Sequence, residues 1–168
     1  MSKKVLIANR GEISLRAIRA CKELGLKTVC IYSEGDKELK SLRFSDESVC
    51  VGPADPTKSY LDAPTILSAA DVTGSDAIYP GYGFLAEDHS FAEQCNLSGF
   101  KFIGPSSQTI RQMGDKITAK SIVTKYGIDG VPGYDKELPN NEEEILKIAD
   151  EIGSVSYTHL RAHETGPY

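Results

Sequence analysis

The chain has 168 residues, 40% of them apolar and 26% charged, and a net charge of −5, a composition typical of a folded domain rather than of disorder or a coiled coil. The negative charge and the dispersed basic residues argue against nucleic-acid binding. No apolar stretch approaches the roughly 20 residues of a membrane span and the N-terminus lacks a signal-peptide pattern, so we expect a cytoplasmic protein without membrane contact.

Five short apolar runs rich in valine and isoleucine predict β-strands. They span residues 4–8, 27–32, 48–51, 76–79 and 100–104. Runs that are almost continuously apolar are typical of parallel strands covered on both faces, so we expect all five to be central strands.

Helical patterns separate most of these strands. Residues 11–25 repeat apolar side chains at helical spacing, residues 64–73 begin with a proline, and Asp88 can cap a helix that ends before Gly99. Strands that alternate with helices need crossover connections, and right-handed crossovers build an open, doubly wound parallel sheet. The sequence therefore predicts an α/β, Rossmann-like domain over the first ~110 residues.

After residue 105 the pattern becomes helical without strands. Helices are predicted within residues 106–114, 115–127 and 140–153, and Ile145, Ile148 and Ile152 share one face of the last. We interpret these helices as the start of a second domain. Residues 154–168 show neither a strand period nor a helix period.

The four cysteines are widely spaced and form no CxxC motif or Cys/His cluster. They are Cys21, Cys30, Cys50 and Cys95. Each lies within an apolar run, and a free cysteine behaves as a small apolar residue, so all four are predicted to be buried and reduced.

Two loops follow predicted strands in the manner of ligand-binding loops. Residues 8–12, ANRGE, hold a single glycine, Gly11, which favours a structural turn over a dinucleotide-binding loop, although a helix N-terminus can still bind an anion. Residues 80–84, PGYGF, lie beyond the carboxyl end of a strand, where ligands bind in open parallel sheets. A turn with a buried aromatic residue is the alternative interpretation of this second loop.

Two further patterns are ambiguous from the residues alone. Lys116 follows Asp115, a predicted helix cap, and is either a surface lysine or a phosphate-binding charge. His159 and His163 have helical spacing but lack a third metal ligand and the glutamate of HExxH, so we predict no metal site there.

Several long motifs, in order and spacing, resemble the N-terminal part of the biotin carboxylase family. They are KVLIANRGEISLRAIRACKELGLKTVCIYSEGD, SYLDAPTILSAA, DAIYPGYGFLAED, FIGPSSQTIRQMGDKITAK and the VPG turn, and they cover about residues 3–153. Tyr79 replaces a histidine that is usual in the family, and Ala86 replaces a serine.

The resemblance implies a division of the chain and a chemistry. Residues 1–113 would form the domain that precedes an ATP-grasp module, and residues 114–153 the start of that module. The family is an ATP-dependent carbon–nitrogen ligase in acetyl-CoA, pyruvate and related carboxylases. It uses ATP, Mg²⁺ or Mn²⁺ and bicarbonate to form carboxyphosphate, and carboxylates biotin on a carrier protein, which a carboxyltransferase then uses.

The resemblance also implies roles for particular residues. Lys116 would contact the ATP phosphates. Tyr82 and Gly83 would face the bicarbonate and biotin site. Glu87 would lie behind them and support them without contacting the ligand. Arg19 and Glu23 would lie at a homodimer interface, where the two charges pair across a two-fold axis.

The resemblance stops at residue 153. The family continues with a strand, a second ATP-binding lysine, a glycine-rich loop, metal-binding carboxylates and the catalytic base, so no catalytic or metal-binding residue is expected in this chain. We interpret residues 154–168 as a tail foreign to the family, produced by a frameshift, a chimeric read or foreign translation.

Three functions remain open on these grounds. The first is a fragment of biotin carboxylase that is inactive by itself, with the exposed apolar helix faces of an incomplete domain. The second is a non-catalytic module that dimerises with a full-length carboxylase through Arg19 and Glu23. The third is a fragment of another ATP-grasp ligase, which PGYGF and MGDK fit less well.

Overall fold

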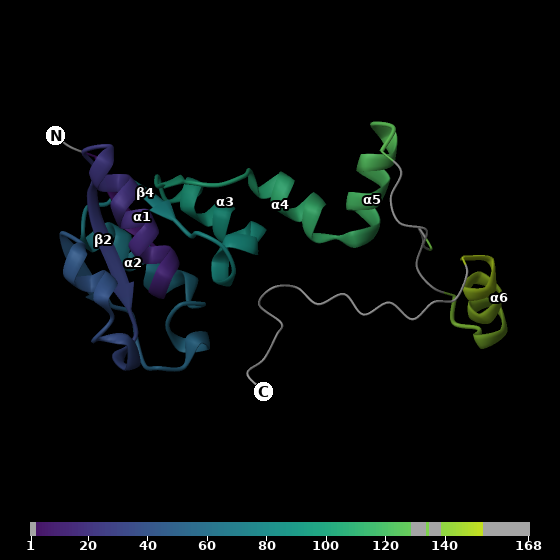
Figure 1. Cartoon of the computed structure of the whole chain (residues 1–168), viewed down its shortest axis with the longest axis horizontal. Helices are drawn as coiled ribbons and strands as arrows, with labels where there is room; N and C mark the ends of the chain where they lie inside the picture. Colours follow the sequence, from purple (N-terminus) through teal and green to yellow (C-terminus); the bar gives the residue numbers. More distant parts are fainter. Residues whose placement is uncertain (1–2, 129–133, 135–138, 153–168) are drawn as a thin grey trace. The chain divides into compact units, whose positions relative to one another are not determined.

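The computed structural model describes residues 3–128, 134 and 139–152 (Figure 1). The chain divides into two compact units, residues 1–114 and 115–168, and each is described by itself. The predicted tail of residues 154–168, with His159 and His163, lies outside the described residues.

The first unit is built on a parallel sheet of five strands in the order β3-β2-β1-β4-β5. The strands are β1 (Lys4–Ile7), β2 (Lys27–Tyr32), β3 (Glu47–Cys50), β4 (Ala77–Tyr79) and β5 (Lys101–Phe102). The chain runs outward from β1 to β3 and then returns to the other side of β1, which is the reversal that defines a doubly wound sheet. This order confirms the predicted α/β fold class.

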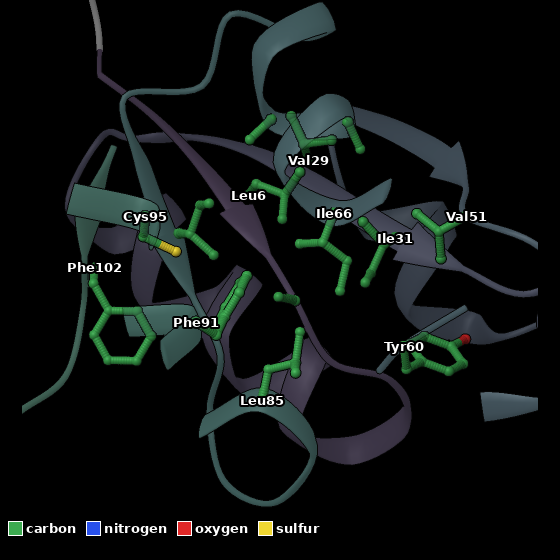
Figure 2. Packing of buried hydrophobic residues seen from close by; sticks show 14 of the residues in the cluster. Leu6, Val29, Ile31, Val51, Tyr60, Ile66, Leu85, Phe91, Cys95 and Phe102 are labelled. Carbon is green, nitrogen blue, oxygen red and sulfur yellow. The ribbon is translucent and has the colours of Figure 1, made fainter. Parts of the chain in front are cut away.

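Helices cover both faces of this sheet. The helices of the unit are α1 (Gly11–Glu23), α2 (Ala63–Val72), α3 (His89–Leu97) and α4 (Ser107–Gly114). On one face Ala17 and Ile18 of α1 pack with Ile7 and Cys30. On the other face α2 and α3 pack on the strands in the larger core cluster (Figure 2).

The alternation of side chains along a strand explains why residues 5–7 of β1 are all apolar. Leu6 joins the cluster under α2 and α3, whereas Ile7 joins the cluster under α1, and both are completely buried. Since successive side chains of a strand point to opposite faces, a strand covered on both sides has no position for a polar residue.

The prediction that all five strands are central is wrong for β3 and β5, which are the edges of the sheet. Glu47, Ser48 and Cys50 of β3 are exposed, so Cys50 is also an exception to the predicted burial of the cysteines. The other three cysteines are buried, and all four are free thiols. Burial raises the pKa of Cys30 and of Cys95 to about 12.

The described part of the second unit contains two helices, α5 (Lys116–Lys125) and α6 (Glu142–Ile152). The Asp115 carboxylate accepts a hydrogen bond from the Thr118 amide at 2.6 Å, which confirms the predicted cap of α5. Ile145, Leu146 and Ile152 of α6 are at least one-third exposed. No helix in the described ranges has both the length and the apolar character needed to cross a membrane.

Candidate functional site

The segments after β1 and β4 lie side by side at the carboxyl edge of the sheet. The parallel pairing of the two strands continues one step further, because the Ala8 amide donates to the Tyr79 carbonyl oxygen at 2.8 Å. Asn9 then lies against residues 80–82. The two loops that stood out in the sequence therefore form one structure.

Asn9 connects these two loops with its side chain. Its Nδ2 donates to the Pro80 carbonyl oxygen at 2.7 Å and to the Tyr82 carbonyl oxygen at 2.9 Å. Its Oδ1 accepts from the Arg10 amide at 2.8 Å. Asn9 is only 4% exposed, so these bonds satisfy a buried amide that would otherwise be costly.

The loop of residues 80–84 has an unusual backbone. Gly81, Gly83 and Phe84 have positive φ angles of +72°, +64° and +45°. A Cβ on Gly81 would lie 2.9 Å from Cγ1 of Ile13 and 3.1 Å from Nδ2 of Asn9, which leaves no room for a side chain. Positive φ is unfavourable for a residue with a side chain, so Phe84 needs a compensating contact.

Tyr60 provides that contact beneath the loop. The rings of Tyr60 and Phe84 are stacked, with centroids 5.3 Å apart. The Arg10 guanidinium lies over both rings, 5.7 Å from the centroid of Tyr60 and 5.9 Å from that of Phe84. Such cation–π and stacking contacts favour one position of the loop.

Asp36 joins this cluster from the segment that follows β2. Its carboxylate pairs with Arg10 at 3.2 Å and accepts hydrogen bonds from the Tyr60 hydroxyl at 2.7 Å and from the Ser33 hydroxyl at 3.1 Å. The Tyr60 hydroxyl in turn accepts from the Ser33 amide at 2.9 Å. The carboxyl ends of β1, β2 and β4 are thus connected through polar side chains.

The electrostatics of the cluster follow from these contacts. Burial acts to raise the pKa of Asp36, but hydrogen bonds from Tyr60, Arg10 and Ser33, together with the Arg10 charge, outweigh it and lower the pKa. Burial and the hydrogen bond to Asp36 raise the pKa of Tyr60 to about 12. At neutral pH Asp36 is therefore a carboxylate and Tyr60 a neutral donor.

The structure places the predicted loop residues on the outside of this support. Tyr82 is 62% exposed, Gly83 is half-buried, and Glu87 is exposed at the end of a short 3₁₀ helix, Phe84–Glu87. Leu85, two residues before Glu87, belongs to the larger core cluster (Figure 2). The loop is thus anchored by Asn9, Phe84 and Leu85 and presents Tyr82 and Gly83 outward.

The remaining predicted site residues lie elsewhere. Arg19 and Glu23 are exposed on α1 and line a surface hollow of about 470 Å³, together with Glu12, Leu15, Arg16 and Ala20. Lys116 is the first residue of α5, and its side chain lies outside the described part of the chain. Among the described side chains, no three His, Cys, Asp or Glu residues gather in a way that could hold a metal ion.

The prediction from sequence missed Asn9, Arg10, Asp36 and Tyr60. Asn9 and Arg10 lie in the loop of residues 8–12, whose position after the first strand marked it in the sequence, but only Gly11 of that loop was considered there. Asp36 and Tyr60 lie in irregular segments whose convergence depends on the tertiary fold. No local pattern marks them.

Comparison with known proteins shows which family this chain resembles. The family model described as "Biotin carboxylase, N-terminal domain" matches residues 1–110. Biotin carboxylase of Pseudomonas aeruginosa is 58% identical over 153 residues, which cover 91% of this chain but 34% of that protein. The chain thus spans about a third of the length of this curated relative.

Solved structures give the same result. A Campylobacter jejuni biotin carboxylase in complex with a β-γ-ATP ligand is 46% identical, with a TM-score of 0.85 over 91% of this chain and 34% of the other. A biotin carboxylase domain dimer of Hydrogenobacter thermophilus 2-oxoglutarate carboxylase, with MgADP, ADP and bicarbonate, is 47% identical. Its TM-score is 0.84 over 91% of this chain and 33% of that chain. The chain belongs to the biotin carboxylase family and contains its N-terminal domain.

Proposed function

We propose that this chain forms one wall of a biotin carboxylase active site. In that role it serves the ATP- and bicarbonate-dependent carboxylation of biotin on a carrier protein, through carboxyphosphate, for a carboxyltransferase. The observation that carries the proposal is the loop of residues 80–84, held at the carboxyl edge of the sheet with Tyr82 62% exposed. The bound bicarbonate and MgADP of the Hydrogenobacter relative support the same chemistry.

Within this proposal each loop residue has a distinct part. Tyr82 offers a ring face and a hydroxyl, and Gly83, which lacks a side chain, allows a ligand to approach the backbone closely. Glu87 is exposed four residues after Gly83 and adds negative charge near the loop. Lys116 would bind the ATP phosphates as a point charge at the beginning of α5.

The phosphoryl-transfer step needs groups that this chain does not supply in its described part. Metal ions and further cations neutralise the charge that develops during such a transfer, and no metal-binding group of side chains is described here. Since the chain spans a third of the Pseudomonas enzyme, we propose that the 168-residue polypeptide by itself does not cleave ATP in response to bicarbonate. A direct assay for phosphate release measures this, and robust turnover would overturn the proposed inactivity.

The function itself is testable in an intact enzyme. Residues 1–153 would replace the matching part of the Pseudomonas aeruginosa enzyme, with which they are 58% identical. We expect this hybrid enzyme to cleave ATP in a biotin-dependent reaction. In its Tyr82→Ala variant we expect a roughly tenfold higher KM for biotin, the size of effect that the loss of one aromatic-ring contact produces. Tyr126→Ala, which truncates a tyrosine that is 81% exposed on the other unit, is the matched control. An active hybrid in which both variants bind biotin equally well would reject the role of Tyr82.

The hollow on α1 favours a second function as a non-catalytic module. In this alternative, Arg19 and Glu23 pair the chain with a full-length carboxylase subunit. Mixing the chain with an intact biotin carboxylase and measuring its sedimentation tests this. A chain that sediments alone at all ratios would exclude the module.

A further inference from the structure

We infer that Asn9 is a positioning residue for this site, whose side-chain amide holds residues 80–82 in the conformation that presents Tyr82 and Gly83. Asn9 is only 4% exposed, and its side-chain amide is taken up by hydrogen bonds to the loop and to the Arg10 amide. That Tyr82 and Gly83 contact the substrate rests on the proposed function. That Asn9 holds the loop in place does not depend on it.

The hydrogen bonds of Asn9 fix both ends of its amide. The two N–H groups of Nδ2 face two carbonyl oxygens, those of Pro80 and Tyr82, and Oδ1 faces a backbone N–H donor, that of Arg10. A rotated amide would place its oxygen against two acceptors, so the assigned orientation is the one that satisfies every group. Aspartate has the same shape but cannot donate twice, and alanine cannot donate at all.

The loop is shaped to fit this amide. Gly81 lies between the two residues whose carbonyl oxygens accept from Asn9, and a Cβ at this position would lie only 3.1 Å from Nδ2, so the absence of a side chain leaves room for the amide. The other end of the loop is held by a separate contact, the stacking of Phe84 on Tyr60. Tyr82 and Gly83 lie between these two contacts. Loss of the Asn9 hydrogen bonds would therefore make them more mobile while the stacking of Phe84 on Tyr60 remains.

Asn9 also connects the loop to the sheet. It follows β1, the central strand, whose backbone pairing to β4 continues through the Ala8 amide and the Tyr79 carbonyl oxygen. A side chain on this rigid strand end can therefore hold a loop that has few backbone hydrogen bonds of its own. Precise positioning of groups that bind substrate usually depends on such supporting contacts.

The chain contains no tryptophan, so Tyr82→Trp creates a single tryptophan on the loop, whose fluorescence is excited selectively over that of the tyrosines. In this background we expect Asn9→Asp and Asn9→Ala to lower the fluorescence anisotropy of the tryptophan by roughly a third, because the loop gains nanosecond mobility. The helix content measured by circular dichroism should stay unchanged. Asn96→Asp, the same substitution at an exposed asparagine of α3, is the matched control and should leave the anisotropy unchanged.

A residue that merely stabilised the fold would lower the melting temperature without a selective change at position 82. Folded Asn9 variants with unchanged anisotropy would therefore overturn the inference. If both variants fail to fold, NMR of the unmodified chain decides: the Asn9 side-chain amide protons should exchange with solvent at least tenfold more slowly than those of Asn96. Equal exchange rates would overturn it. Neither measurement uses a substrate, so a confirmed hold on the loop in a chain whose hybrid enzyme is inactive would reject only the proposed function.

Discussion

Gly81 is the residue of the loop at which both the backbone angle and the available space exclude a side chain. Its φ is +72°, and a Cβ would lie 2.9 Å from Ile13 and 3.1 Å from Asn9. Gly74 has a similar φ of +63° but nothing within 4 Å of its Cβ position. The two glycines therefore separate the cost of the backbone angle from the cost of crowding.

We expect Gly81→Ala to lower the free energy of unfolding by about 2 to 3 kcal/mol, and Gly74→Ala by about 1 kcal/mol. Both variants place a Cβ on a left-handed residue, but only the first displaces neighbouring atoms. Urea unfolding of the two variants measures the difference. Equal losses would show that Ile13 and Asn9 shift easily and that the loop is not tightly packed.

Asp36 gives the same site a dependence on pH. Its pKa is lower in the folded chain than its ordinary value of 3.8, because its hydrogen bonds and Arg10 outweigh its burial. The unfolded chain therefore binds a proton at a higher pH than the folded chain does. The stabilisation by Asp36 is complete above pH ~4 and is lost as the pH falls through the lower, folded pKa.

We expect Asp36→Asn to be less stable than the unmodified chain at pH 6 and to lose less stability between pH 5 and pH 3. Free energies of unfolding in urea across this range give the comparison. Asp71→Asn, which removes an exposed carboxylate in α2, is the control for the loss of one negative charge. Parallel slopes for Asp36→Asn and the unmodified chain would show that Asp36 is not a source of the acid sensitivity.

At the scale of the elements, α3 is fixed by a local signal. The Asp88 carboxylate accepts from the amides of Ser90 at 2.7 Å and Phe91 at 3.3 Å, as the sequence predicts for a cap. Burial acts to raise the pKa of Asp88, and these hydrogen bonds outweigh it and lower the pKa. We expect Asp88→Ala to cost about 1 kcal/mol of unfolding free energy and Asp88→Asn much less, because asparagine caps equally well. Equal losses in the two variants, measured in urea, would argue against the cap.

The other elements show which structural features can be predicted from local sequence patterns and which cannot. The helices α1, α2 and α3 lie within a residue or two of their predicted ranges because caps, prolines and glycines are local. The edge position of β3 was not predictable, since the strand order depends on contacts between distant residues. The candidate site divides in the same way: the loop of residues 80–84 follows a recognisable strand, whereas Tyr60 and Asp36 reach it only through the tertiary fold.

The whole molecule raises the question of self-association. Arg19 and Glu23 are one helical turn apart on the exposed side of α1 and carry opposite charges. If this side pairs with a second copy across a two-fold axis, each arginine meets a glutamate of the other copy.

We expect Arg19→Glu to weaken a dimer of the chain by about tenfold in Kd, because it places like charges together, and the double variant Arg19→Glu/Glu23→Arg to restore it. Sedimentation velocity over a range of concentrations measures both. Lys101→Glu, a charge reversal on β5 at one edge of the sheet, is the control. A double variant as weak as the single one would mean that the two charges do not face each other.

The exposed edge strand has one more consequence, which concerns chemical reactivity. Cys50 on β3 is the one exposed thiol of the four, and burial holds Cys21, Cys30 and Cys95 away from solvent with raised pKa values. A thiol reagent will therefore attach one label to each folded molecule and four to each unfolded one. The average number of labels per molecule therefore reports the fraction of molecules in a sample that are folded.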